Sequence, residues 1–117
     1  MSKTYDLEQR TETFAKNVRA FVKSLPRTIA NIEDVKQLVR SSGSVGANYI
    51  EANESLGKKD FLMRIKISRK EAKESGYWLR LLDCADNGEI EKQREALVQE
   101  SSELMKIFGA ILTKSQS

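Results

Sequence analysis

Histidine is absent from the 117-residue chain, and cysteine occurs once, at Cys84. Without histidine the chain lacks the usual general base near neutral pH, the commonest metal ligand, and any Ser-His or Cys-His nucleophilic pair. A lone cysteine cannot form an intrachain disulfide or a cysteine-cluster metal site, so Cys84 is expected to be a small buried apolar residue. We therefore expect no catalytic residues, no metal and no cofactor, and hence no enzyme.

Proline and long apolar runs are also scarce. The chain has one proline, and no apolar run approaches the roughly 20 residues that a membrane span needs. The first ten residues contain neither the apolar segment nor the small-residue cleavage site of a secretory signal. A chain of this length suits one hydrophobic core. We therefore expect a single domain over residues 1–117 that is cytoplasmic and does not bind a membrane.

Charged residues, by contrast, are abundant. Twenty Lys and Arg residues against 17 Asp and Glu residues give a net charge of +3, and the pI is about 9.0. Such a balance suits a nucleic-acid partner without requiring one, because many basic helical proteins bind none. Whether a nucleic-acid partner is indicated therefore depends on how the charges are distributed along the chain.

The spacing of apolar residues predicts helices, beginning with two in the first half of the chain. Apolar positions at intervals of three and four predict one amphipathic helix over residues 5–25, ended by Pro26. Asn31 is expected to cap a second helix, since a side-chain amide can accept a bond from the first turn. That helix is expected to continue to about Leu56, with Gly57 as its C-terminal cap.

Two further helices are predicted in the second half. Apolar spacing predicts a third helix over residues 58–86, ended by the turn at Asn87-Gly88, and a fourth from about Glu89, with residues 114–117 fraying. Short connections force sequence neighbours to lie antiparallel. The expected architecture is therefore all-α, an antiparallel up-down-up-down four-helix bundle.

Small residues are concentrated in the middle of the predicted second helix. Gly43 and Gly46 are expected to let a neighbouring helix approach closely, which offsets their unfavourable helix propensity of about 1 kcal/mol each. Asn48 lies beside them and is expected to be buried, so its amide must find hydrogen-bond partners. This region therefore predicts tight helix packing.

The predicted third helix has two apolar faces. One is expected to face the core of the bundle and comprises Phe61, Ile65, Ala72 and Leu79. The second lies roughly opposite and comprises Met63, Ile67, Trp78 and Leu81, together with Ala85. A helix in a bundle normally buries one stripe, so the second face predicts a subunit interface with Trp78 as its anchor. The alternative is that Trp78 packs at the periphery of the protomer's own core.

Seven basic residues lie within an arc of about 120° on the same helix. This basic stripe consists of Lys58, Lys59, Lys66, Arg69, Lys70, Lys73 and Arg80. Such a stripe can neutralise nucleic-acid phosphates without reading sequence, and its affinity then falls steeply with salt. The alternative is a solvated face on which Glu71 and Glu74 pair with Lys70 and Lys73.

Short segments along nearly the whole chain form a combined pattern: Arg10-Thr11, Phe14-Ala15, Leu25-Pro26, Gln37-Leu38, Arg40-Ser41, Ser44, Gly46-Ala47-Asn48, Glu51-Ala52, Asp60-Phe61, Lys70-Glu71-Ala72, Glu74 and Tyr77-Trp78-Leu79-Arg80-Leu81-Leu82. The pattern resembles the bacterial four-helix bundle proteins encoded in intervening sequences of 23S ribosomal RNA genes. Gly43 departs from the Ala or Thr expected there. The resemblance implies a homopentameric ring and supplies no catalytic residues.

A more distant resemblance is to the accessory variability determinant of diversity-generating retroelements, a basic pentameric barrel that engages a reverse transcriptase and nucleic acid. Two functions are therefore expected. The first is a non-enzymatic homo-oligomer that binds RNA, with ribosomal RNA as the candidate, through the basic stripe. The second is an interaction scaffold that docks a partner protein, such as a nucleic-acid enzyme, without contacting RNA.

Overall fold

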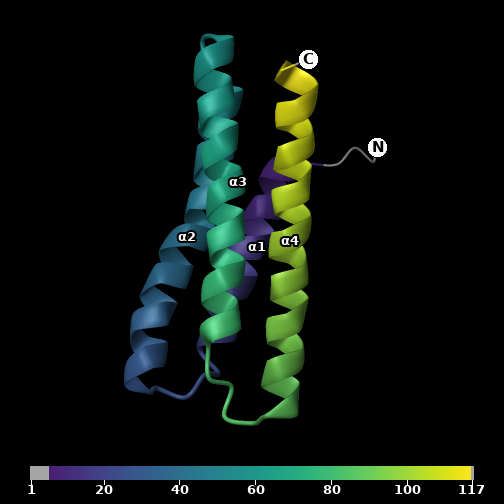
Figure 1. Cartoon of the computed structure of the whole chain (residues 1–117). Coiled ribbons are helices and arrows are strands. Elements are labelled where there is room, and N and C mark those ends of the chain that lie inside the picture. Colours follow the sequence, from purple (N-terminus) through teal and green to yellow (C-terminus); the bar gives the residue numbers. More distant parts are fainter. Residues whose placement is uncertain (1–5, 117) are drawn as a thin grey trace.

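The computed structural model describes residues 6–116, which form four α-helices and contain no strand (Figure 1). The helices are α1 (Leu7–Val22), α2 (Ile29–Asn53), α3 (Lys58–Leu81) and α4 (Gly88–Gln116). The predicted all-α class and the predicted number of helices are confirmed.

Side-chain oxygens fix the starts of three helices. The carboxylate of Asp6 accepts a bond from the first turn of α1, and the Asn87 side chain does the same for α4. At α2 the Thr28 hydroxyl accepts from the backbone N–H of Asn31 at 3.0 Å. Asn31 therefore lies inside the first turn, and its predicted capping role is wrong, because Thr28 supplies an equally good cap three residues earlier.

Three predicted helix ends are also corrected. Helix α1 stops at Val22, and the last N–H groups before Pro26 turn back onto carbonyls three residues earlier. Helix α2 stops at Asn53, and Gly57 is the N-cap of α3 with an extended φ of −152°, so it does not end α2. Helix α3 stops at Leu81 because the next residue, Leu82, has an extended backbone with a ψ of 139°, and Ala85 and Asp86 further on have positive φ.

Two further predictions concern the outer ends of the first and last helices. Tyr5, the predicted start of the first helix, lies outside the described residues, as does Ser117. Helix α4 continues to Gln116, so the fraying predicted from residue 114 does not occur over 114–116.

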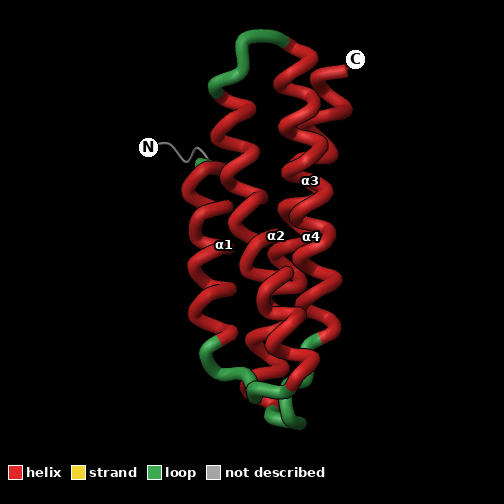
Figure 2. Tube along the Cα trace, turned by 90° about the vertical axis from the view of Figure 1, so that its left-hand side faces the viewer, coloured by secondary structure: helices red, strands yellow, loops and turns green. Residues whose placement is uncertain are grey.

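Each helix contacts two others, since α1 packs on α2 and α4, and α3 packs on α2 and α4. The pairs that join α2 to α3 run in opposite order along the two helices: Asn48 contacts Arg64, whereas Ser41 contacts Ser75. Figure 2 shows the α2–α3 connection at one end of the molecule and the other two connections at the opposite end. The molecule is elongated, with principal extents of 46 × 31 × 20 Å.

The core lies between the four helices and draws on all of them. Its largest fully buried apolar side chains are Phe14, Val18, Leu38, Val45, Ile65, Leu79, Leu104 and Phe108. Removing each from water contributes roughly 1.5–3 kcal/mol. On the predicted core face of α3, Ile65, Ala72 and Leu79 are buried and Phe61 is half-buried, so that face is confirmed.

The Asn31 side chain joins two connections at one end of the bundle. Its Nδ2 donates to the carbonyls of Pro26 and Asp83, both at 2.9 Å, and its Oδ1 accepts from the N–H of Asp83 at 2.9 Å. Asn31 is fully buried, so these bonds satisfy groups that would otherwise be costly to desolvate. The α1–α2 and α3–α4 connections are therefore held against each other.

Candidate nucleic-acid interface

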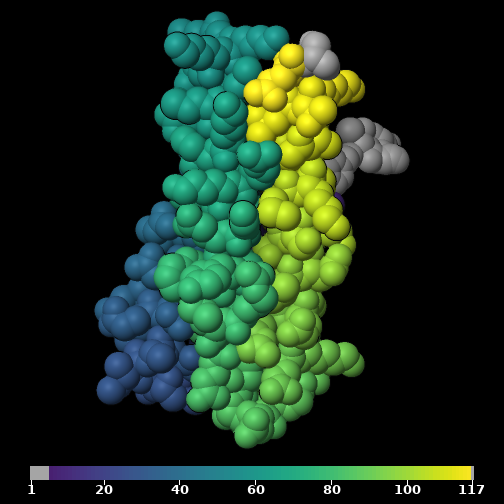
Figure 3. Space-filling model, in the orientation of Figure 1, coloured from purple at the N-terminus to yellow at the C-terminus, as the bar shows by residue number. Residues whose placement is uncertain are grey.

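Helix α3 has a larger net positive charge than the chain as a whole. It contains eight Lys or Arg residues and three Asp or Glu residues, a net of +5 in a chain whose total is +3. The boundary between α3 (teal to green) and α4 (yellow-green to yellow) faces the viewer in Figure 3. Most of the basic stripe lies along this boundary.

Two adjoining hollows follow the boundary between α3 and α4. The first, of about 510 Å³, is lined by Lys66, Arg69, Lys70, Lys73, Met105 and Gly109. The second, of about 350 Å³, is lined by Lys73, Gly76, Arg80, Val98, Gln99, Ser101, Ser102 and Met105. Because Lys73 and Met105 line both, the hollows form one continuous depression, called here the α3–α4 groove. Five of the seven predicted basic residues line it.

The other two basic residues lie beyond the groove, at the start of α3. Both Lys58 and Lys59 are exposed. Lys59 and Met63 line a shallow apolar hollow of about 700 Å³, which Lys66 shares with the groove. The predicted stripe is therefore brought together over Lys66 to Arg80, and its first two members extend it past one end.

Most cations of the groove have no partner within the protein. Lys70 forms an ion pair with Glu74, with its Nζ 3.9 Å from Oε2. Within residues 6–116, Lys66, Lys73 and Arg80 form no hydrogen bond or ion pair, and the same holds for Arg69. The predicted pairing of Lys70 is thus confirmed, and the predicted pairing of Lys73 is wrong.

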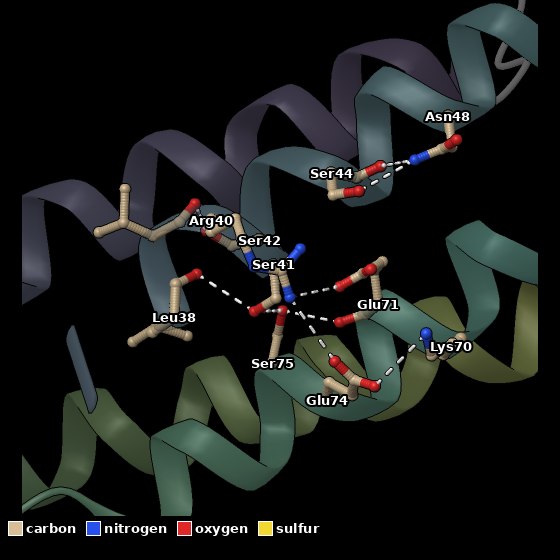
Figure 4. A network of polar contacts seen from close by, with 11 residues as sticks. Leu38, Arg40, Ser41, Ser42, Ser44, Asn48, Lys70, Glu71, Glu74 and Ser75 are labelled. Atoms are coloured by element: carbon tan, nitrogen blue, oxygen red, sulfur yellow. Dashed lines mark hydrogen bonds and ion pairs between the residues drawn. The ribbon is translucent and has the colours of Figure 1, made fainter. Parts of the chain in front are cut away.

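Two of the three acidic residues of α3 face its other neighbour, α2, instead. The Arg40 guanidinium of α2 lies 3.4 Å from the Glu71 carboxylate and 3.7 Å from that of Glu74 (Figure 4). Glu71 is only 6% exposed, so a partner for its charge matters there. Arg40 thus holds two carboxylates on the side of α3 that faces α2.

Serines close this α2–α3 seam, defined here by the residues of α2 and α3 that touch one another. The hydroxyls of Ser41 and Ser75 are 2.9 Å apart, and the Ser68 hydroxyl donates to the carbonyl of Val45 at 2.9 Å (Figure 4 shows the first pair). All three serines are fully buried. Small side chains that bond to one another or to backbone let the two helices lie close together.

Asn48 extends the polar contacts toward the end of the seam. Its Nδ2 donates to the carbonyl and hydroxyl of Ser44, and its Oδ1 accepts from Arg64 of α3 at 3.0 Å. The prediction that its amide is hydrogen-bonded is confirmed, although the residue is half-buried where full burial was expected.

Glycines set the separation of neighbouring helices at two places. A Cβ on Gly76 of α3 would lie 2.7 Å from the Ser101 hydroxyl of α4, so α4 approaches closely there. A Cβ on Gly46 would lie 2.8 Å from the Thr11 hydroxyl of α1, which confirms its predicted role in close approach. Gly43 faces only the flexible guanidinium of Arg19, so no helix requires its small size.

Two acidic residues of α4, Glu100 and Glu103, face Arg10 of α1. Arg10 of α1 donates to Glu100 at 2.6 and 2.8 Å and to Glu103 at 2.8 Å. A hydrogen bond from Gln99, helped by Arg10, lowers the pKa of the Glu103 carboxyl. Both carboxylates are bound by Arg10 of α1, and the residues of α4 that line the groove carry no charge.

The predicted interface residues are partly covered by their own chain. Met63 and Leu81 are each 48% exposed, and Ile67 and Trp78 are half-buried, with Trp78 packed against the core. The assignment of these four to a subunit interface stays a prediction. Ala85 lies beyond the end of α3 with a φ of 57°, so it cannot share their face as predicted.

Three other features concern metal binding, membrane spans and the single cysteine. Residues 6–116 contain no group of three or more His, Cys, Asp or Glu side chains that could hold a metal ion. None of the described helices combines the length and the hydrophobicity needed to cross a membrane. Cys84 is buried, as expected, and burial raises the pKa of its thiol.

Sequence reasoning missed the contributions of neighbouring helices. Arg40 of α2, and Gln99, Met105 and Gly109 of α4, shape the two sides of α3, but no sequence pattern placed them beside it. The only available signal was the clustering of cations on one helix, which does not show which residues lie beside them.

Residues 3–110 match the family model described as 23S rRNA-intervening sequence protein. The chain is also similar to a crystal structure of a protein of unknown function from the S23 ribosomal protein family of Bacteroides thetaiotaomicron. The two are 29% identical with a TM-score of 0.75, and the match covers 92% of this chain and 98% of that one. No curated protein shows a significant match.

Proposed function

Because this chain belongs to the 23S rRNA-intervening sequence protein family, we propose that it is a non-enzymatic protein that binds RNA phosphates in the α3–α4 groove. The observation that carries the proposal is that four unpaired cations of α3 line one continuous groove whose α4 side is uncharged. Ribosomal RNA is the candidate that the family suggests.

The arrangement suits a phosphate backbone more than a folded acidic partner. Lys66 and Arg80 are 14 residues apart, a distance of about 21 Å along a helix at 1.5 Å per residue. Cations spread over that length can contact several phosphates and release their counterions. Contacts to phosphates carry no sequence information, so the expected binding is independent of sequence.

We also propose that the protein is a ring-like homo-oligomer, a pentamer, of antiparallel up-down-up-down bundles. Half-exposed Met63 and Leu81, together with Ile67 and Trp78, support a subunit interface on α3. A ring would repeat the groove and turn a weak site into a multivalent one. Replacing Trp78 with Ala and measuring the mass in solution tests this: we expect a smaller species, and an unchanged mass would contradict the interface.

RNA binding is tested by titrating a fluorescent structured RNA at two salt concentrations. The variant Lys66→Glu/Arg69→Glu/Lys73→Glu should lose binding at least about 100-fold, because three phosphate contacts become repulsive. The matched control, Lys16→Glu/Lys23→Glu/Lys36→Glu, changes the net charge equally on exposed positions of α1, its C-cap and α2. The control should bind nearly as well as the unaltered protein.

Two outcomes would contradict the proposal. Equal losses in both variants would show that net charge alone is responsible, and the groove would have no special role. Absence of binding by the unaltered protein at low salt would remove RNA altogether. The latter result would favour the alternative, a scaffold that docks a partner protein on the half-exposed apolar residues of α3.

A further inference from the structure

Tyr77 is the only exposed aromatic residue in the described part of the chain, with 49% of its surface accessible. The other described aromatic residues are buried or half-buried: Phe14, Phe21, Tyr49, Phe61, Trp78 and Phe108. Tyr77 therefore differs from the other described aromatic residues, all of which are at least half-buried. The residues that border Tyr77 therefore indicate what its exposed ring can contact.

Tyr77 lies on the basic stripe of α3. On a helix, a residue neighbours those three and four positions away, so Tyr77 lies between Lys73 and Arg80. Both of these cations line the α3–α4 groove and have no partner within residues 6–116. Glu74 is also a neighbour, but its carboxylate lies 3.7 Å from Arg40 and 3.9 Å from Lys70, on the side of α2. The ring is therefore bordered by positive charge on the groove side.

The ring of Tyr77 is held in place by one edge contact. Its centroid lies 5.1 Å from that of Trp78, and the two planes meet at 67°. Trp78 is half-buried and packs on the core, so it is a firm support. Within residues 6–116 the Tyr77 hydroxyl forms no hydrogen bond. A tilted contact of this kind covers at most one face of the Tyr77 ring, and with 49% of the residue exposed the other face can stack on a flat partner.

We propose that Tyr77 stacks on an unpaired base of bound RNA while Lys73 and Arg80 contact the phosphates on either side. This rests on the proposed function and adds a substrate class to it. The bases of a continuous duplex are stacked on one another and present no free face, whereas bases in loops, bulges and ends stack readily on aromatic side chains. The protein should therefore prefer RNA with unpaired nucleotides over a continuous duplex.

The test compares two RNAs with the same number of phosphates, one a hairpin with an unpaired loop and the other a fully paired duplex. The unaltered protein should bind the hairpin roughly 5- to 150-fold more tightly, the range typical of stacking one base. Tyr77→Ala should lose this preference and keep its affinity for the duplex. Tyr77→Phe keeps the ring and should retain the preference.

Trp78 provides an independent reading, because it is the only tryptophan of the chain and touches Tyr77. A base stacked on Tyr77 should change the emission of Trp78 when the hairpin binds, and the duplex should change it much less. This reading uses the unaltered protein, so it remains available if Tyr77→Ala fails to fold.

The outcomes separate the two proposals. No binding of either RNA at low salt overturns the proposed function itself. Binding of both RNAs with equal affinity, or a preference that survives Tyr77→Ala, overturns the role of Tyr77 and leaves phosphate binding in place. A change of mass in Tyr77→Ala with an unchanged preference would place the ring in a subunit contact and would also overturn it.

Discussion

The two sides of α3 differ in how they meet their neighbours. Toward α2 the helix presents buried serines, and its carboxylates face Arg40, so charge is paired and the seam is closed. Toward α4 it presents unpaired cations above a groove whose far side is uncharged. One helix therefore supplies both a structural joint and a surface free to bind an anion.

This difference shows which side chains allow two helices to pack closely. Ser41, Ser68 and Ser75 occupy little volume and satisfy one another or a backbone carbonyl, and the buried carboxylate of Glu71 is paired with Arg40. Lys and Arg side chains keep their heads in water, and in the groove only Gly76 brings α4 close. The following predictions test whether the closed seam and the open groove differ energetically as they do in shape.

The largest effect is expected from filling the closed seam. Ser41→Leu places a bulky side chain at a fully buried site and removes the bond to Ser75, which should lower the free energy of unfolding by about 3 kcal/mol. The matched change Ser102→Leu in the groove should alter it by less than about 0.5 kcal/mol. Urea denaturation of both variants measures the difference, and equal losses would contradict it.

A smaller effect is expected from removing the partner of a buried carboxylate. Arg40→Ala leaves Glu71 without its ion pair and should lower the free energy of unfolding by about 1.5 kcal/mol. This value is near the low end of the range for a buried group that loses its partner, because Arg40 is itself half exposed. Adding Glu71→Gln should recover most of this loss. Lys73→Ala in the groove should cost less than about 0.5 kcal/mol. Thermal unfolding of the four proteins checks the order, and a cost for Lys73→Ala equal to that of Arg40→Ala would refute it.

Two helical glycines on the α3–α4 boundary offer a finer test. Gly76→Ala should destabilise by about 1 kcal/mol, since the new methyl group displaces the Ser101 hydroxyl from the Val98 carbonyl. At Gly109 a Cβ would meet only Arg69 at 3.8 Å, so Gly109→Ala should stabilise by about 0.5 kcal/mol through helix propensity. Opposite signs in denaturant titrations confirm that the groove is tight at Gly76 and open at Gly109.

The smallest effect concerns Cys84, which lies apart from both sides of α3. Burial raises the pKa of its thiol, so at pH 8 the folded protein should react with iodoacetamide at least about 10-fold more slowly than the denatured protein. A raised folded pKa adds stability that is present below the unfolded pKa and lost as pH rises through the folded one. Mass spectrometry over time measures the labelling, and equal rates would contradict the burial.

Much of the fold could be predicted from the sequence, because apolar spacing reports the face of a helix directly. The spacing of Ile65, Ala72 and Leu79 identified the buried face of α3, and the stripe from Lys66 to Arg80 follows from the same geometry. Helix ends were less certain, since Thr28 and Asn31 are both good caps and only packing selects one.

The groove itself could not be predicted. It depends on which face of α4 lies beside α3, and residues such as Gln99 and Met105 have no pattern that announces a neighbour. The same holds for Arg40, whose two carboxylate contacts depend on the register between α2 and α3. Contacts between helices are set by three-dimensional packing, which one-dimensional spacing does not specify.

Because of the buried amide of Asn31, the two ends of the bundle should differ in how readily they open. At the Asn31 end, separating either connection from the other breaks bonds in both, so the helix ends there should open together or not at all. At the opposite end of the bundle the α2–α3 turn carries a fully exposed Leu56, and no described side chain there forms a set of bonds like that of Asn31. Amide hydrogen exchange should therefore begin at the end where Lys58 and Lys59 extend the positive charge beyond the groove.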